Sequence, residues 1–150
     1  MRRINNRAYA EFKGSIYAPD LRGYVYFYEV FVEVWGLPSY KPANGGEPIG
    51  PFGFHIHEYG ICEITDPMDP FSSAGGHYNP TDQPHGNHAG DLPVLFSNDG
   101  YARMSVFTSK FKPRDIIGRS IIIHQNPDDY RGQPAGNAGK RIGCGLIKAV

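Results

Sequence analysis

The chain has no long apolar run and no excess of charge, and each absence argues against a class of protein. No stretch of the 150 residues approaches the roughly 20 apolar residues that a membrane-spanning helix needs. Fifteen basic and fifteen acidic side chains cancel, so no overall field attracts nucleic acid or an anionic membrane. We therefore expect neither nucleic acid nor a membrane as a partner.

Cysteine is also scarce, because only Cys62 and Cys144 are present. They lie too far apart in the sequence to form a local metal knuckle, and neither has a neighbouring cysteine for a thiolate site. From their spacing alone, a disulfide and two free buried thiols are both open.

The start of the chain has little of what a secretory leader needs. Residues Met1 to Arg7 carry the charge of a leader, but no apolar run follows them. We therefore expect a cytoplasmic protein, and an exported mature form stays open. A length of 150 residues predicts a single domain over residues 1–150 with a core of its own.

Glycine, proline and aromatic residues are abundant instead. The chain has 19 glycines, 13 prolines, 10 tyrosines and 9 phenylalanines, and few long runs of good helix formers, which favours short strands joined by turns. We predict an all-β fold. The predicted strands cover residues 9–17, 23–28, 30–34, 52–58, 94–96, 101–108, 116–124 and 141–147.

Alternation in two of these strands directs histidines away from the core. Phe54 and Ile56 can enter the core, so His55 and His57 emerge together on the opposite face. In the strand over 116–124, His124 likewise points away from the core. Residues 60–93 then form a loop far longer than usual, which bound metal could organise.

The six histidines and one aspartate of this region are enough ligands for two adjacent metal sites. Neutral imidazole and carboxylate suit zinc and copper(II), and one imidazole could touch two ions through its two nitrogens. A histidine pair spaced as His55 and His57 is by itself mostly a surface accident. A binuclear zinc hydrolase would need aspartate and histidine after this pair, where the chain has Glu58 and Tyr59. The residues in question are His55, His57, His77, His85, His88, Asp91 and His124.

Several motifs in one order resemble the copper/zinc superoxide dismutase family. They are GFHIHEYG, GGHYNP, HAGDLP, IIGRSIIIH and GNAGKRIGCG, and the likeness runs from about Gly53 to the C-terminus. The resemblance implies an eight-stranded Greek-key β-barrel or sandwich with two long functional loops. One of these loops would bind metal, and the other would be of the electrostatic type.

The resemblance also implies a ligand set for each metal. His77 would be the imidazolate that bridges the two ions, since a divalent cation on each nitrogen stabilises the anion. The implied copper ligands are His55, His57, His77 and His124. The implied zinc ligands are His77, His85, His88 and Asp91.

Further residues take roles by the same resemblance. Asp128 would link the copper ligand His55 to the zinc ligand His85, although spacing alone leaves Asp129 open for this role. Cys62 and Cys144 would form the intrachain disulfide. Beside copper, Arg141 would dock a small anion.

The loops depart from the family pattern around this arginine. Lys140 and Arg131 could extend its positive charge, but each is more simply read as a surface charge. Ala135 stands where a threonine commonly narrows the copper channel. The loops themselves are shortened, yet no ligand is lost.

The implied activity is a superoxide dismutase, an antioxidant oxidoreductase that disproportionates superoxide to oxygen and hydrogen peroxide by redox cycling of copper. His77 and Arg141 would be its catalytic residues. The alternative is a non-catalytic module of the same fold that is loaded with zinc or buffers copper; the presence of all four copper positions and Arg141 argues against it. A homodimer is a further prediction, because Tyr24, Tyr26 and Tyr28 share one strand face, although a merely exposed aromatic ladder is equally open.

Overall fold

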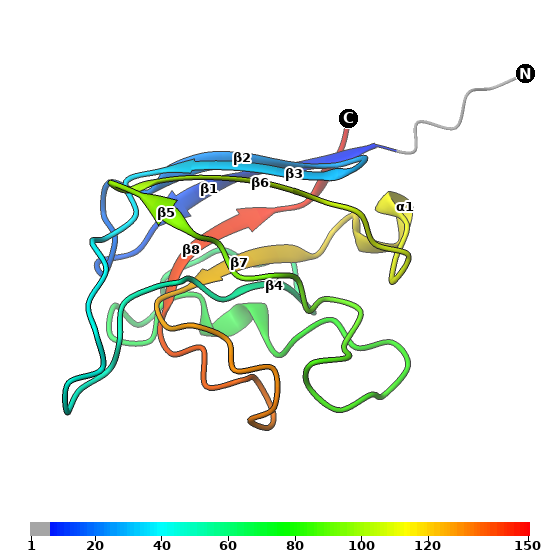
Figure 1. The fold of residues 1–150 in the computed structure, drawn as a ribbon. Coiled ribbons are helices and arrows are strands. Elements are labelled where there is room, and N and C mark those ends of the chain that lie inside the picture. Colours follow the sequence, from blue (N-terminus) through cyan, green and yellow to red (C-terminus); the bar gives the residue numbers. More distant parts are fainter. Residues whose placement is uncertain (1–6) are drawn as a thin grey trace, which may run out of the picture.

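The structure is a computed structural model that describes residues 7–150, and its strands form one antiparallel sheet that curls into a half-barrel (Figure 1). The strands are β1 (Ala8–Gly14), β2 (Arg22–Phe27), β3 (Val30–Trp35), β4 (Phe54–His57), β5 (Ser97–Asn98), β6 (Tyr101–Val106), β7 (Ser120–His124), β8 (Arg141–Leu146) and β9 (Lys148–Ala149). The helical segments are the 3-10 turn η1 (Ser72–Ala74) and α1 (Pro113–Ile116).

The order of strands in the sheet confirms the predicted all-β class. Eight strands follow the path β4-β7-β8-β1-β2-β3-β6-β5, and the two-residue β9 pairs with β1. Among residues 7–150, no helix is both long and apolar enough to cross a membrane. The basic start from Met1 to Arg7, which was not expected to be a secretory leader, lies outside the described part of the chain except for Arg7.

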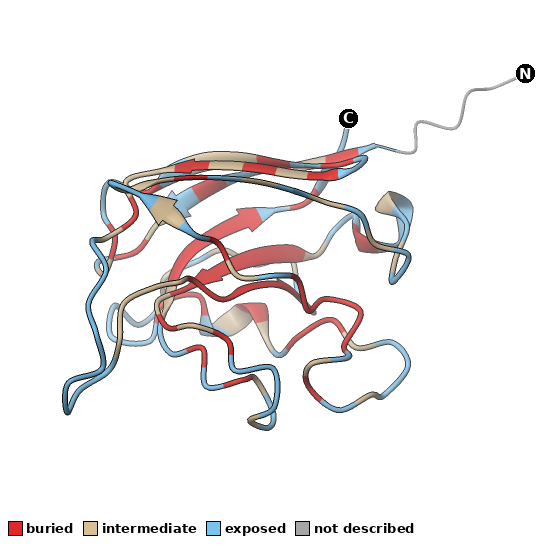
Figure 2. Ribbon diagram, in the orientation of Figure 1, coloured by how far each residue is buried: buried red, intermediate tan, exposed pale blue. Residues whose placement is uncertain are grey.

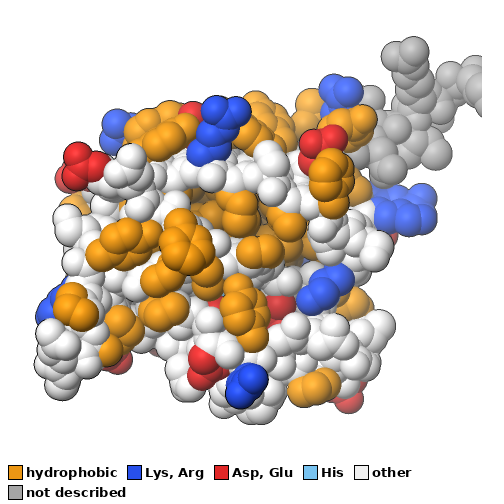
Figure 3. Space-filling model, viewed as in Figure 1, with side chains coloured by type: hydrophobic (Ala, Val, Ile, Leu, Met, Phe, Trp, Pro, Cys, Tyr) orange, Lys and Arg blue, Asp and Glu red, His pale blue; other side chains and the backbone are white. Residues whose placement is uncertain are grey.

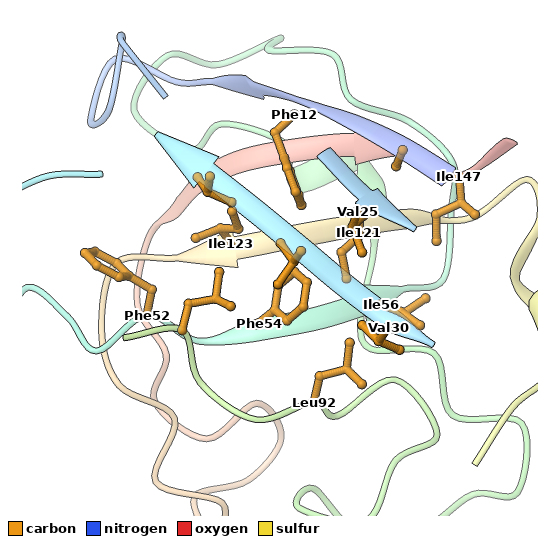
Figure 4. Close-up of a cluster of buried hydrophobic side chains, with 14 of the residues drawn as sticks. Phe12, Val25, Val30, Phe52, Phe54, Ile56, Leu92, Ile121, Ile123 and Ile147 are labelled. Carbon is orange, nitrogen blue, oxygen red and sulfur yellow. The ribbon is translucent and has the colours of Figure 1, made fainter. Parts of the chain in front are cut away.

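The core lies between the two layers of the curled sheet. On β2, Val25 and Phe27 are buried while Tyr26 is 46% exposed, which is the predicted alternation. Figure 4 shows Phe54 and Ile56 facing the same apolar cluster as Ile121. The side chains that alternate into the core are therefore those that the strand period predicts.

Strands β4 and β7 are buried on both faces. Every residue of both strands is buried, as the red ribbons of Figure 2 show. One face packs against the core, and the long loops cover the other, where Ile122 contacts a smaller cluster with Phe71 and Ala74. The histidines of these strands therefore lie buried between the sheet and the loops.

Several predicted strand boundaries were wrong. The strand predicted over 9–17 ends at Gly14, and the one predicted over 101–108 ends at Val106. Two larger differences have a clear position in the fold. Residues 116–124 were expected to form one strand, but Ile116 ends α1 and is fully buried, and β7 begins only at Ser120. Pro113 opens the helical turn, and Gly118 at φ 84° redirects the chain. The first strand of the hairpin was expected at 94–96, but only Leu95 pairs there, through an isolated bridge to Phe52. The strand that pairs with β6 is β5, which begins after this range at Ser97.

Candidate metal centre

Two histidines project from β4 toward the loops, as the alternation predicts. His55 pairs with Ile122 and His57 with Ser120 in the ladder between β4 and β7. Both imidazoles are fully buried. Although β4 ends the sheet path, its backbone pairs with β7 on one side and is bridged to the following loop on the other, so both rings are presented from a fixed floor.

The loop that follows β4 closes over this floor. A disulfide joins Cys62 to Cys144 of β8, which confirms the predicted pairing. Further along, His57 pairs with His77 and His55 with Asp91 through isolated β-bridges. The loop is therefore tied down at both ends, and it brings the remaining ligand candidates over the strand.

The first group of side chains comprises His55, His57, His77 and His124, and each offers a ring nitrogen within 4.8 Å of the others. Hydrogen bonds to backbone carbonyls orient two of the rings. The Nδ1 of His57 donates to the Gly75 carbonyl at 2.9 Å, and the Nδ1 of His124 lies 3.4 Å from that of Gly139. The two Nε2 atoms consequently face each other at 3.2 Å.

The second group comprises His77, His85, His88 and Asp91. Backbone N–H groups of Gly86 and His88 donate to Oδ2 of Asp91 at 2.8 and 3.0 Å, which fixes the carboxylate. Its Oδ1 then lies 2.9 Å from Nδ1 of His77 and 3.3 Å from Nδ1 of His88. Three imidazole nitrogens and one carboxylate oxygen thus converge, which is a donor set that suits zinc.

His77 belongs to both groups. Its Nδ1 faces the second group, while its Nε2 is buried and has no hydrogen-bond partner among the described residues. The Nδ1 atoms of His55 and His85 are also buried without a hydrogen bond, and Nδ1 of His85 lies 3.3 Å from Oδ2 of Asp91. Buried polar atoms normally have a partner, so these three nitrogens are the atoms to which a bound metal ion would coordinate.

Asp128 connects the two groups. Its Oδ2 accepts a hydrogen bond from Nε2 of His55 at 2.5 Å, and its Oδ1 accepts one from Nε2 of His85 at 2.8 Å. These bonds place a proton on each Nε2, which leaves the lone pairs of both rings on Nδ1. Asp129, the other candidate, is exposed and bonds only within its own loop.

Gly136 allows this close packing around Asp128. Its φ is 69°, and a Cβ at this position would collide with Oδ1 of Asp128 and with Nε2 of His85. A residue without a side chain is therefore required here both by backbone conformation and by space.

Burial keeps the imidazoles of the two sheet strands, those of His55, His57 and His124, neutral. It lowers the pKa of His55 to about 4, even though the hydrogen bond that His55 donates to Asp128 acts to raise it, and it lowers the pKa of His57 and of His124 well below the usual range. Burial opposes ionisation of Asp91, but the hydrogen bond from His77 and the nearby imidazoles hold its pKa below the usual value. Neutral imidazoles and an ionised carboxylate are the forms that bind metal.

Arg141 lies at the wall of a pocket of about 460 Å³ that opens over the first group. Its Nη1 donates to the Phe71 carbonyl at 2.8 Å and its Nη2 to the Gly75 carbonyl at 2.7 Å. Burial lowers the pKa of this guanidinium, which nevertheless stays charged at neutral pH. The pocket is lined by His57, His77, His88, His124, Ala135 and Arg141 among others.

Of the two other cations near Arg141, Lys140 lies over the Tyr17 ring at 4.7 Å. Arg131 is exposed and does not line the pocket. Ala135 does line it, at the position that the resemblance in sequence motifs implied. The face drawn in Figure 3 shows no pale-blue histidine surface, in keeping with exposures of 9% or less for all six imidazoles.

The sequence did not reveal the groups that orient these histidines through hydrogen bonds to their rings and backbones. The carbonyls of Gly75 and Gly139 orient rings, and no side-chain pattern encodes a carbonyl direction. The amide of Gln133 and the ammonium of Lys110 bond to the backbones of His85 and His88. Both residues are remote from their targets in sequence, so no local spacing could have revealed them.

Comparisons with known proteins agree with this geometry. The family model described as copper/zinc superoxide dismutase (SODC) matches residues 22–147. The chain is 43% identical to superoxide dismutase [Cu-Zn] 1 of Aquifex aeolicus over 71% of this chain and 69% of that protein. It is 39% identical to superoxide dismutase [Cu-Zn] of Deinococcus radiodurans over 81% of this chain and 70% of the relative.

The comparison of structures gives the same result. The Cu/Zn superoxide dismutase from Brucella abortus superposes with a TM-score of 0.73 at 28% sequence identity, over 95% of this chain and 99% of that one. The sequence and structure comparisons together therefore cover both the ligand-bearing loops and the barrel beneath them.

Proposed function

Because the chain belongs to the copper/zinc superoxide dismutase family, we propose that its two histidine groups are a copper site and a zinc site. Nδ1 of His55 and Nε2 of His57, His77 and His124 would hold copper. Nδ1 of His77, His85 and His88 and Oδ1 of Asp91 would hold zinc. The buried nitrogens of His55, His77 and His85 that have no other partner support this division.

The family disproportionates superoxide, and this is the activity of the chain. Two superoxide anions and two protons give one dioxygen and one hydrogen peroxide. Bound copper supplies the one-electron redox chemistry, and zinc supplies a fixed charge that organises the loops. The remaining tasks, which are docking, orientation and proton holding, fall to side chains of this chain.

Arg141 is the residue that would dock the anion. Its two bonds to backbone carbonyls fix the plane of the guanidinium beside the pocket floor. A fixed positive charge that needs no reorientation attracts and aligns a small anion. Since the Gly75 carbonyl also accepts the hydrogen bond from His57, the docking residue and a ligand share one anchor.

His77 would hold a proton as well as link the sites. Its Nε2 is buried and borders the pocket, while its Nδ1 is held against Asp91. A proton held at Nε2 would therefore lie within reach of an anion docked at Arg141.

The alternative of a metal-binding module without catalysis has less support. A storage site would need the histidines but not a charged guanidinium at the pocket wall. Arg141 is half-buried, which is an arrangement that costs desolvation and that metal storage does not require. The single observation that carries the enzyme proposal is this combination of Arg141 with the shared His77.

The proposal is tested by metal content and activity on one preparation. Anomalous scattering at the copper and zinc absorption edges should place one ion on each side of His77, and the same protein should accelerate superoxide decay. Protein loaded with zinc alone should be folded and inactive. A preparation full of copper that leaves superoxide decay unchanged would defeat the proposal.

Two partner predictions remain to be measured. Sedimentation equilibrium would decide between the predicted homodimer and a monomer over a range of protein concentrations. The expected lack of nucleic-acid binding can be checked by titrating labelled duplex DNA at low salt, where nonspecific binding is strongest.

A further inference from the structure

The segment from Asp128 to Gln133 contacts the loop that carries the proposed zinc ligands His85, His88 and Asp91. It does so at several points besides the carboxylate of Asp128. The hydroxyl of Tyr130 accepts a hydrogen bond from the Val94 N–H at 2.9 Å. The Tyr130 carbonyl packs so closely on Gly86 that a Cβ there would collide with it. The two loops are therefore built as one unit around His85.

Gln133 makes the most specific of these contacts. Its Oε1 accepts a hydrogen bond from the backbone N–H of His85 at 2.8 Å. Its Nε2 donates to the carbonyl of the same residue at 3.3 Å and to the Arg131 carbonyl at 3.1 Å. One side-chain amide thus pairs with both backbone groups of His85, as a neighbouring strand would.

His85 needs such a partner because it lies outside the sheet. His55 and His57 have their backbones fixed by the β4–β7 ladder, and His124 lies in β7. Among the ladder and bridge pairs of the described residues, none includes His85. Asp128 fixes only the far side of its ring, so the backbone must be placed by another group.

From this geometry we infer that Gln133 is a positioning residue for zinc, acting through the backbone of His85. The inference rests on the proposed zinc site. The amide of Gln133 fixes the main chain while Asp128 fixes the ring, and the two together aim Nδ1 of His85 at the ion. Zinc affinity therefore depends on a side chain in a different loop that never touches the metal.

The test is the substitution Gln133→Met, which keeps the length of the side chain and removes its amide. The full chain is loaded with zinc or with copper separately, and each affinity is measured by chelator competition. We expect zinc to bind roughly 10-fold more weakly, and copper to change by less than about 3-fold, because no copper ligand contacts Gln133.

A matched control is Gln83→Met. Gln83 precedes His85 by two residues, and its amide bonds to Thr81 and Asn87 rather than to a ligand candidate. This variant should retain the zinc affinity of the parent chain. The amide of His85 should also exchange faster with solvent in Gln133→Met, and at the parent rate in Gln83→Met.

The possible results separate the inference from the proposed function. If the parent chain itself binds no zinc, the proposed site fails. If the parent binds zinc and Gln133→Met binds it equally well, the inference fails while the site stands. Equal losses in Gln133→Met and Gln83→Met, or equal losses of zinc and copper, would also overturn it, because these results indicate general loosening.

Discussion

The carboxylate of Asp128 offers a sharp test of how the two metal sites are joined. Asp128→Ala removes the acceptors of two buried Nε2–H groups, those of His55 and His85. Hydrogen bonds to charged groups contribute about 1.5–3 kcal/mol each, and outer contacts of this kind change metal affinity by about 10- to 100-fold. Both sites should weaken, but not equally.

Zinc should be lost first because the two rings are supported differently. The backbone of His55 lies in the ladder between β4 and β7 and also bridges to Asp91. The backbone of His85 lies in a loop and has the Gln133 amide as its support. We expect zinc affinity to fall about 100-fold and copper affinity about 10-fold, the two ends of the expected range.

The assay is chelator competition, with each metal loaded alone. Asp129→Ala is the matched control, since Asp129 is the adjacent residue, is exposed and bonds only within its loop. That control should change either affinity by less than about 3-fold. The reasoning is refuted if Asp128→Ala keeps its zinc, or if it loses copper more strongly than zinc.

Three further predictions follow from the same structure. Arg141→Glu should slow superoxide decay by about 10-fold or more at low salt while both metals stay bound, and an unchanged low-salt rate would contradict its docking role. Cys144→Ser should lower the free energy of unfolding by up to about 4.5 kcal/mol, measured by urea titration, because the disulfide closes a loop of 82 residues; equal midpoints for the oxidised and mutant chains would contradict this. The metal-free protein should lose stability as pH falls from about 6.5 toward 4. Unfolded imidazoles take protons there that the buried ones refuse, and His55, with its pKa lowered to about 4, accounts for roughly 3 kcal/mol. Urea midpoints that stay flat over this window would show that the folded imidazoles take up protons as readily as the unfolded ones.

Much of the fold is visible in the strand period. Val25 and Phe27 alternate with tyrosines, and Phe54 and Ile56 alternate with histidines, so inner and outer faces could be assigned without coordinates. The largest error occurred where local breakers act within an apolar run. Ile116 looks like a strand residue, yet Pro113 and Gly118 on either side place it in a helical turn.

The candidate ligands were equally visible, because histidine and aspartate were named by type and spacing. The sequence could not say which ring nitrogen each histidine presents. That choice depends on what the other nitrogen meets: Asp128 for His55 and His85, and a backbone carbonyl for His57. These partners come from distant loops, so the choice exists only once the chain is folded.

The sequence by itself therefore determined the chemistry that is available: six imidazoles, a carboxylate and a guanidinium on a chain whose apolar period builds a sheet. Only the tertiary structure decided how these groups are used, because burial keeps His55, His57 and His124 neutral and contacts between loops fix the orientation of the rings. The position of Gln133 beside His85, 48 residues earlier in the chain, is the clearest case. The order of residues along a chain specifies which groups are present. A metal site also requires its ligand atoms to be placed to within a fraction of an ångström, and only the packing of the folded chain provides this precision.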